Sequence, residues 1–402
     1  MTWHTGSALS PLQILPFIGN CSDSAAGQRL AGDDGSLKVS IILGTRPQII
    51  KSAPVYAAFR KAGIECDIVN TGQHYDYEMN RQFFTELELP EPATDLSVGS
   101  GSPNMQVSAI ISGLDEHFEK SRPDIAVVPG DTNSALAAGV ACSKSRVPVA
   151  HLESGCRSGD YRMAEEVNRR LLDHLSQLLL CPTSSCVLNV RSEHVLAAGI
   201  YNVGDTMYDS LLKLLPRIRA SEVASGYGLR RGEYAFMTLH RAETVDNPRA
   251  LREVMDAVGM LPLPIAFSVH PRTRARIREF GLRSKPNIRL LEPLPYAQTL
   301  GLVKDSEFVI TDSGGLQKEA FWLERPTLIT RETTEWGEIV KAGAAFLVGT
   351  SPKRIREGYA LIQRIDRRRF RLSKKVFGNG KASPKVVRAV SDFMRSGGRD
   401  WK

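Results

Sequence analysis

The chain has 402 residues, which is too long for one hydrophobic core of ordinary size, so two domains are expected. Its 42% hydrophobic and 24% charged residues are typical of a soluble globular protein. No apolar stretch approaches the ~18–20 residues of a membrane span, and no secretory signal is recognisable at the start. Six cysteines without CxxC pairing predict reduced thiols, a cytoplasmic location and no zinc site.

The net charge of +8 suits either a nucleic acid or an anionic small molecule. Basic residues cluster between Arg364 and Lys375, and we interpret them as a solvated connector rather than a nucleic-acid site. Residues 1–37 are dominated by Gly, Ser, Ala and Asp and have weak periodicity, which predicts a disordered or loosely attached extension.

From Lys38 onward, apolar runs alternate with amphipathic stretches. Strands are expected first at 39–43, 66–71, 125–128 and 147–152, and helices at 47–62, 105–119, 134–144 and 164–180, the last running into a strand. Later strands are expected at 234–239, 265–269, 288–291, 308–311, 327–330 and 344–348, with helices between them. This rhythm predicts an α/β fold with parallel strands and helices on both faces.

Two doubly wound, Rossmann-like domains in tandem fit the length, and the first alternation ends near residues 202–207. We therefore expect an N-terminal domain at 38–206 and a C-terminal domain at 207–371. Parallel sheets bind ligands at the carboxyl ends of their strands, so two such sheets facing each other would form a cleft. Functional side chains are expected directly after each strand.

A glycine-rich turn, Asp312-Ser313-Gly314-Gly315, joins the strand at 308–311 to a helix at 316–323. Free backbone N–H groups and the positive end of the helix dipole favour phosphate at such a helix start. Glu319, one to two turns into the helix, could accept hydrogen bonds from ribose hydroxyls. The alternative is a turn without a ligand, because short glycine motifs recur by chance.

A second, differently built anion site is expected after the first strand, where Gly44 permits a turn and Pro47 starts a helix. Arg46 can grip a phosphate through two hydrogen bonds, and Lys51 acts as a point charge. The alternative is a solvated pair of basic residues.

Acidic and histidine side chains follow several other predicted strands. Asp131 could cap the next helix or act as a catalytic carboxylate. Packing explains Glu153 poorly, because this residue directly follows a buried strand. His240 and His270 end successive strands of the second half, where a side chain that titrates near neutral pH suits catalysis, although a lone His is more often structural.

The helix at 164–180 carries a further candidate, Glu165. Its neighbours offer a structural alternative, since Glu165–Arg169 and Glu166–Arg170 would make ordinary i,i+4 ion pairs.

From Lys38 to its C-terminus, the chain resembles the non-hydrolysing UDP-N-acetylglucosamine 2-epimerases of bacteria and archaea. The motifs that carry the resemblance occur in one order: Gly44-Thr45-Arg46-Pro47, Gly130-Asp131-Thr132, His151-Leu152-Glu153, Glu165-Glu166-x-Asn168-Arg169, His240-Arg241 and Asp312-Ser313-Gly314-Gly315. The resemblance implies a glycosyltransferase-B type fold, whose last helix, within 372–402, crosses back onto the first domain.

The resemblance also implies a reaction, the interconversion of UDP-GlcNAc and UDP-ManNAc without a cofactor or metal. Loss of UDP builds oxocarbenium character at C1 and acidifies the C2 proton, so that a carboxylate can remove it. A bound 2-acetamidoglucal then takes UDP back, with a proton delivered to the opposite face. Such a path needs carboxylates around the sugar and positive charge around the diphosphate.

Roles carried over from the family fall on matching positions of this chain. The catalytic candidates are Asp131, Glu153, Glu165 and His240. The substrate-binding candidates are Arg46, Lys51, Gln73, His74, Arg157, Arg241, His270, Tyr296, Ser313, Gly314, Gly315, Glu319 and Arg331. A homodimer is implied, with neither nucleic acid nor membrane as partner. An activating second UDP-GlcNAc is also implied, with Gln73 and His270 as candidates for its site.

Departures from the family pattern leave the sugar open. Gln48 stands where the family usually has Glu, and Trp336-Gly337 stands where it has Arg-Pro. Relatives that act on UDP-2,3-diacetamido sugar acids share the scaffold. Three other functions remain alternatives: a UDP-sugar-dependent glycosyltransferase, a hydrolysing epimerase and a non-catalytic UDP-sugar or nucleic-acid binding protein.

Overall fold

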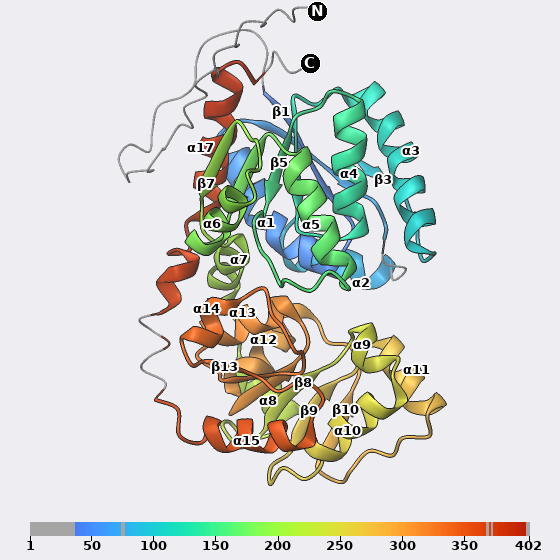
Figure 1. The fold of residues 1–402 in the computed structure, drawn as a ribbon, viewed down its shortest axis with the longest axis vertical. Helices are drawn as coiled ribbons and strands as arrows, with labels where there is room; N and C mark the ends of the chain where they lie inside the picture. The colour runs from blue at the N-terminus through green and yellow to red at the C-terminus, as the bar shows by residue number, and fades with distance from the viewer. Residues whose placement is uncertain (1–36, 74–76, 367–369, 371–372, 399–402) are drawn as a thin grey trace, which may run out of the picture.

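The structure is a computed structural model that describes residues 37–73, 77–366, 370 and 373–398. Two parallel sheets, each covered by helices, form two domains that lie one above the other in Figure 1. The expected extension at 1–37 lies outside the described residues except for Leu37. The predicted α/β class with two doubly wound domains is confirmed.

The first sheet has seven strands in the order β3-β2-β1-β4-β5-β6-β7. The strands are β1 (Lys38–Leu43), β2 (Glu65–Asn70), β3 (Thr94–Asp95), β4 (Ile125–Pro129), β5 (Val149–Leu152), β6 (Leu178–Cys181) and β7 (Gly199–Asn202). The helices are α1 (Arg46–Lys61), α2 (Tyr77–Glu86), α3 (Pro103–Ser121), α4 (Asn133–Lys144), α5 (Ala164–Leu175) and α6 (Ser184–Ser192). Ile41 and Ile42 are both fully buried in separate apolar clusters, because successive strand residues point to opposite, covered faces.

The second sheet has six strands in the order β10-β9-β8-β11-β12-β13. The strands are β8 (Ala235–Thr238), β9 (Ile265–Ser268), β10 (Ile288–Leu291), β11 (Phe308–Thr311), β12 (Thr327–Ile329) and β13 (Ala345–Leu347). The helices are α9 (Ala242–Val245), α10 (Pro248–Val258), α11 (Pro271–Glu279), α12 (Tyr296–Asp305), α13 (Gly314–Trp322), α14 (Gly337–Lys341) and α15 (Pro352–Ile362). The chain order reverses between β1 and β4 in one sheet and between β8 and β11 in the other, which are the positions where such sheets bind ligands.

The segments between and after the two sheets tie the domains together. After β7 come α7 (Thr206–Leu214), a short 3-10 helix (Leu215–Arg217) and α8 (Ala220–Gly226). Helix α7 packs on α1, whereas α8 packs on α12. The C-terminal helix α17 (Ala382–Arg395) returns to contact α1 and α7 (Figure 1). The Asp209 carboxylate of α7 accepts the Ser383 backbone N–H at 2.7 Å, which caps α17 at its start.

Candidate active site

Close packing at the end of β1 explains Gly44 of the first motif and Gln48, which directly follows the motif. A Cβ at Gly44 would overlap the hydroxyls of Thr71 and Ser134. The φ of Gly44 is not positive, so glycine is needed here for space rather than for the turn that we expected. The Gln48 side chain accepts the Gly44 N–H at 2.9 Å and donates to the Pro129 carbonyl at 2.7 Å. Gln48 therefore fastens the end of β1 to the end of β4.

Arg46 begins α1 and faces the second domain. Its guanidinium lies over the Phe83 ring, 5.0 Å from the centroid. In the second domain, the Tyr296 hydroxyl donates to Glu319 at 2.6 Å. Burial lowers the pKa of Arg46, while the charges of Glu319 and Tyr296 act in the opposite direction. Arg46 thus lies within electrostatic reach of the buried Glu319–Tyr296 pair.

Glu153, directly after β5, is held between two lysines. Lys51 of α1 pairs with one carboxylate oxygen, and Lys318 of α13 pairs with the other at 2.5 Å. Lys318 also pairs with Asp205, at 2.5 Å. Burial raises the pKa of Glu153, but the charges of Lys318 and Lys51 outweigh burial and bring this pKa to about 2. Glu153 is therefore ionised at neutral pH.

The backbone places Glu153 beside the end of β4. Its φ of +71° lies in the left-handed region, which costs energy for a residue other than glycine. A Cβ at Gly130 would lie 3.3 Å from Lys51 Nζ and 4.0 Å from Glu153 Oε2. The two strand ends thus bring the backbone of Gly130 next to the Glu153 carboxylate, and Asp131 follows Gly130 in the chain.

Arg169 of α5 joins carboxylates from both domains. It pairs with Asp131, with Glu166 at 2.7 Å and with Glu335 of the second domain at 3.4 Å. Glu335 is also paired with Arg331 at 2.9 Å. Burial raises the pKa of Glu335, but Arg331 and Arg169 outweigh it and hold this pKa well below its usual range. This cluster therefore stays charged across the domain interface.

The prediction of a Glu165–Arg169 ion pair is wrong, whereas the predicted Glu166–Arg170 ion pair is confirmed, with 3.0 Å between the charged atoms. Glu165 instead faces Arg241 of the second domain, with 3.6 Å between the charged atoms. The reason is that Arg169 turns inward to a more buried set of carboxylates.

His240 and Asp312 join the ends of β8 and β11. The His240 Nδ1 lies 3.0 Å from one Asp312 oxygen, and the other oxygen accepts the backbone N–H groups of His240 and Arg241 at 2.8 Å. Burial raises the pKa of Asp312, but His240 and these hydrogen bonds lower it below its usual range. The His270 ring centroid lies 6.4 Å from that of His240. Both histidines are exposed.

The start of α13 lies between the two charged clusters. The Ser313 hydroxyl accepts the Leu316 N–H at 3.4 Å, and Gly314 and Gly315 carry no side chain over the first turn. A Cβ at Gly314 would lie 3.5 Å from Glu335, and one turn further along Lys318 reaches Glu153. The glycine pair is thus flanked by both sets of carboxylates.

Three substrate-binding candidates lie elsewhere or are not described. Arg157 is fastened to Asp173 and Glu193, each at 2.7 Å, in a buried network of the first domain. Gln73 accepts the Ser134 N–H at 2.9 Å, at the start of α4. His74 lies outside the described residues.

Sequence reasoning missed Lys318, Asp205 and Glu335, which hold the candidate carboxylates and cations in place. One signal was present for Lys318. Gln317-Lys318-Glu319 is a polar run in an otherwise apolar helix, and a helix covered by apolar neighbours cannot expose three consecutive residues.

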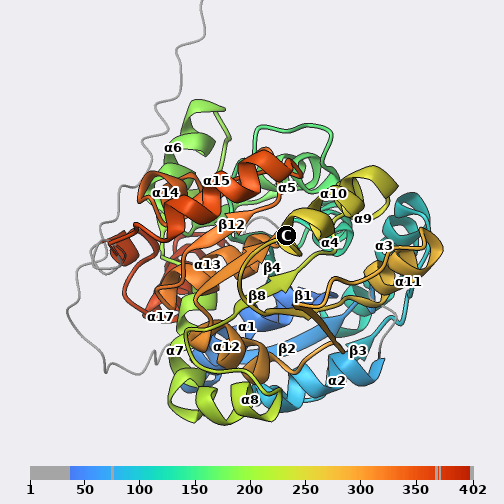
Figure 2. The same ribbon diagram turned by 90° about the horizontal axis from the view of Figure 1, so that it is seen from below.

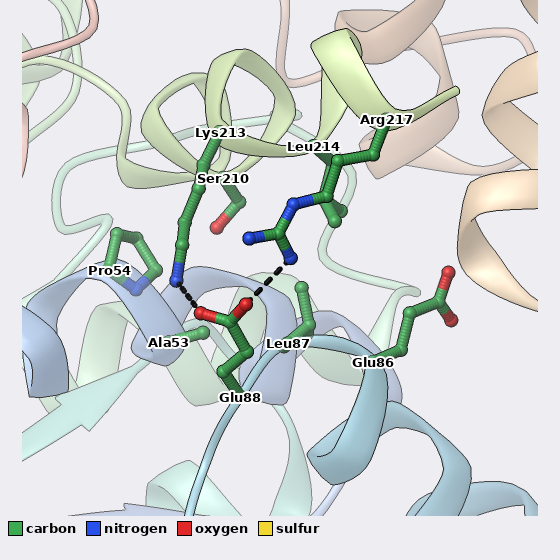
Figure 3. Close-up of a pocket in the computed structure, with 9 residues that line it drawn as sticks. All are labelled: Ala53, Pro54, Glu86, Leu87, Glu88, Ser210, Lys213, Leu214 and Arg217. Carbon is green, nitrogen blue, oxygen red and sulfur yellow. Dashed lines mark hydrogen bonds and ion pairs between the residues drawn. The ribbon is translucent and has the colours of Figure 1, made fainter. Parts of the chain in front are cut away.

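A hollow lies apart from these clusters, between α1, the segment after α2 and α7 (Figure 3). Glu88 crosses it to Lys213 at 2.7 Å and Arg217 at 2.6 Å. All three side chains are substantially exposed. These ion pairs therefore join two segments at the surface, and the hollow is not part of the buried charged clusters. In the part of the chain that the structure describes, no group of three or more His, Cys, Asp and Glu could hold a metal ion.

Two parallel-sheet domains, with paired carboxylates and a glycine-started helix between them, define a two-domain α/β protein of the glycosyltransferase-B type. The family profile of UDP-N-acetylglucosamine 2-epimerase matches residues 57–391. The chain belongs to this family, whose members are isomerases. No helix among the described residues is long and apolar enough to cross a membrane.

Individual relatives agree with this assignment. A UDP-N-acetylglucosamine 2-epimerase of Methanocaldococcus jannaschii is 37% identical over 88% of this chain and 99% of its own length. A UDP-2,3-diacetamido-2,3-dideoxy-D-glucuronate 2-epimerase of Pseudomonas aeruginosa is 36% identical over 87% of this chain and 98% of its own length. The crystal structure of the M. jannaschii enzyme in complex with UDP-GlcNAc and UDP superposes with a TM-score of 0.83, at 38% identity, and covers 89% of this chain and 100% of that one.

Proposed function

We propose that this protein interconverts UDP-GlcNAc and UDP-ManNAc by eliminating UDP and adding it back. The observation that carries the proposal is the position of the α13 start between the paired carboxylates of two domains. A diphosphate at the free N–H groups of Gly314 and Gly315 would leave the attached sugar among Asp131, Glu153 and Glu165. Arg46 would approach the same diphosphate from the first domain, and Glu319 would accept the ribose hydroxyls.

The paired charges suit elimination. As the C1–O bond breaks, negative charge grows on the departing UDP, and fixed N–H groups and cations stabilise it. His240 assists at the diphosphate. One of the three carboxylates takes the C2 proton, and another group returns a proton to the opposite face. Water must be kept out while the glycal is held, and the ion pairs between the domains, Arg169–Glu335 and Arg241–Glu165, favour a closed cleft.

Incubation with UDP-GlcNAc in D2O tests the proposal. We expect deuterium at C2 and the appearance of UDP-ManNAc in the NMR spectrum. No exchange and no new epimer would refute it. The P. aeruginosa relative favours a second candidate, a UDP-2,3-diacetamido sugar acid, and the same assay with that sugar compares the two by kcat/KM. UDP release only in the presence of an acceptor would instead indicate a glycosyltransferase.

The family resemblance supports two further proposals, a homodimer and an activating UDP-GlcNAc near Gln73 and His270. Sedimentation tests the dimer. A sigmoidal dependence of rate on UDP-GlcNAc, made hyperbolic in His270→Ala, tests the activating site.

A further inference from the structure

Lys318 is the most buried of the cations that pair with carboxylates between the two domains. Its side chain is 1% exposed, and its ammonium lies between the carboxylates of Glu153 and Asp205. Trp336 covers it, with the ring centroid 4.1 Å from Nζ. A buried ammonium needs such partners, because isolation from water costs a charge several kcal/mol. The site therefore holds Lys318 in one fixed position.

The contacts of Lys318 join three parts of the fold. Lys318 belongs to α13 of the second sheet, Glu153 follows β5 of the first, and Asp205 precedes α7 in the connecting segment. Asp205 is itself anchored, because its other oxygen accepts the Met207 N–H at 2.9 Å. Helix α13, which is expected to bind the diphosphate at its start, thus pairs through Lys318, one turn later, with the Glu153 carboxylate of the facing domain.

Among the described residues, four titratable groups surround the Glu153 carboxylate. Lys51 comes from α1, Lys318 from α13, Asp205 from the segment before α7, and Cys156 from the loop after β5. Lys51 and Lys318 are cations, Asp205 is a second carboxyl group, and Cys156 is a thiol that burial keeps protonated by raising its pKa. Removal of Lys318 would leave Lys51 as the single cation in contact with Glu153 in the described part of the chain.

We propose that Lys318 is a positioning residue, which aims the Glu153 carboxylate at the sugar and keeps it ionised when the two domains are closed. The proposal rests on the proposed function for its catalytic consequence. Lys318 is not proposed to touch the sugar. It acts through Glu153, and because Lys318 belongs to α13, it connects the Glu153 carboxylate to the helix start where the diphosphate would bind.

The test compares Lys318→Met with wild type in the D2O exchange assay. Methionine keeps the apolar stem and the volume under Trp336 but removes the charge. We expect kcat for exchange to fall about 100-fold, since a misplaced group costs about that factor, while the Kd for UDP changes less than about threefold. The low-pH limb of the kcat profile should move to higher pH, because Glu153 loses a cation that stabilises its charged form.

Two further variants keep the result interpretable. Lys318→Met leaves the buried Asp205 carboxylate without its cation, and the double variant Lys318→Met/Asp205→Asn removes that unpaired charge. A fall in kcat that persists in the double variant therefore reflects loss of positioning and not misfolding. Lys374→Met breaks a partly buried ion pair with Glu324, at 2.8 Å, just beyond the end of α13, and should keep wild-type exchange. Wild-type kcat and an unmoved acid limb in Lys318→Met would overturn the proposal.

A titration independent of activity separates this proposal from the proposed function. The 13C carboxyl resonance of Glu153, assigned with Glu153→Gln, should titrate at higher pH in Lys318→Met than in wild type. An unchanged titration contradicts the role of Lys318 whatever the enzyme catalyses. If wild type exchanges no deuterium, the proposed function fails, and this titration still decides whether Lys318 controls Glu153.

Discussion

Glu86, at the end of α2 in the first domain, accepts the backbone N–H of Tyr296 at the start of α12 in the second, at 3.0 Å. Its other oxygen accepts the Ala297 N–H. A carboxylate from one domain thus occupies the positive end of a helix in the other. Figure 2, seen from below, shows α2 and α12 on the same side of the molecule, and their contact agrees with it.

We predict that Glu86→Ala weakens domain closure. Two helix-start N–H groups lose their acceptor, which costs about 1 kcal/mol and is expected to raise the Kd for UDP about fivefold. Isothermal titration with UDP measures the change. Glu88→Ala is the matched control, because Glu88 lies two residues on and pairs with exposed Lys213 and Arg217 of the connecting segment, not with the second sheet domain (Figure 3). Equal affinities for both variants would contradict the closure role of Glu86.

Arg169 is predicted to hold Asp131 in place. Arg169→Met leaves Asp131 without its cation and Glu335 with fewer partners, so we expect unfolding free energy to drop by about 3 kcal/mol. Exchange activity should fall about 10²- to 10⁴-fold. The neighbouring Arg170→Met breaks a similar pair with Glu166 but touches no catalytic candidate. Urea unfolding and the exchange assay compare Arg169→Met with Arg170→Met. Similar losses of activity in the two variants would refute the role of Arg169 in holding Asp131.

Glu153→Gln is predicted to abolish C2 exchange while UDP still binds. The amide keeps the shape of the side chain but cannot take a proton, so a loss of about 10²- to 10⁴-fold is expected. Glu193→Gln is the control, since Glu193 also lies between basic residues, Arg157 and Arg170, but both of these partners belong to the first domain. Exchange near the wild-type rate in Glu153→Gln would remove this residue from the catalytic set.

The buried Asp173 should make stability depend on pH. Burial raises its pKa, but His151 and Arg157 outweigh burial and lower it below its ordinary value. A depressed carboxyl pKa stabilises the fold above the unfolded value near 4 and loses that contribution as pH falls through the folded pKa. Asp173→Asn should therefore cost about 3 kcal/mol at pH 7 and clearly less near pH 3. Urea unfolding at both pH values checks this, and an equal cost at each would contradict it.

The sequence predicted the alternating elements well because parallel strands buried on both faces form continuous apolar runs, as in β4 and β11. Weakly patterned elements were missed, including β3 with two residues and β7 with partly exposed ones. The helix running into a strand that was expected at 164–180 is confirmed, with α5 ending at Leu175 and β6 beginning at Leu178.

Contacts between the domains were harder to foresee than the elements. Glu153, after β5, and Lys318, on α13, are 165 residues apart, and only the docking of two sheets brings their charges together. Arg169 shows the same limit. Local spacing favoured a pair with Glu165, but tertiary contacts with Asp131 and Glu335 prevailed.

Cleavage of the C1–O bond is the central claim, and one isotope measurement tests it most directly. UDP-GlcNAc with 18O between C1 and the β-phosphorus is incubated with the protein, and the recovered substrate is analysed by 31P NMR. If UDP leaves and returns, rotation of the freed phosphate moves the label into non-bridging positions of the recovered UDP-GlcNAc. Label that stays in the bridging position while the sugar epimerises would contradict elimination.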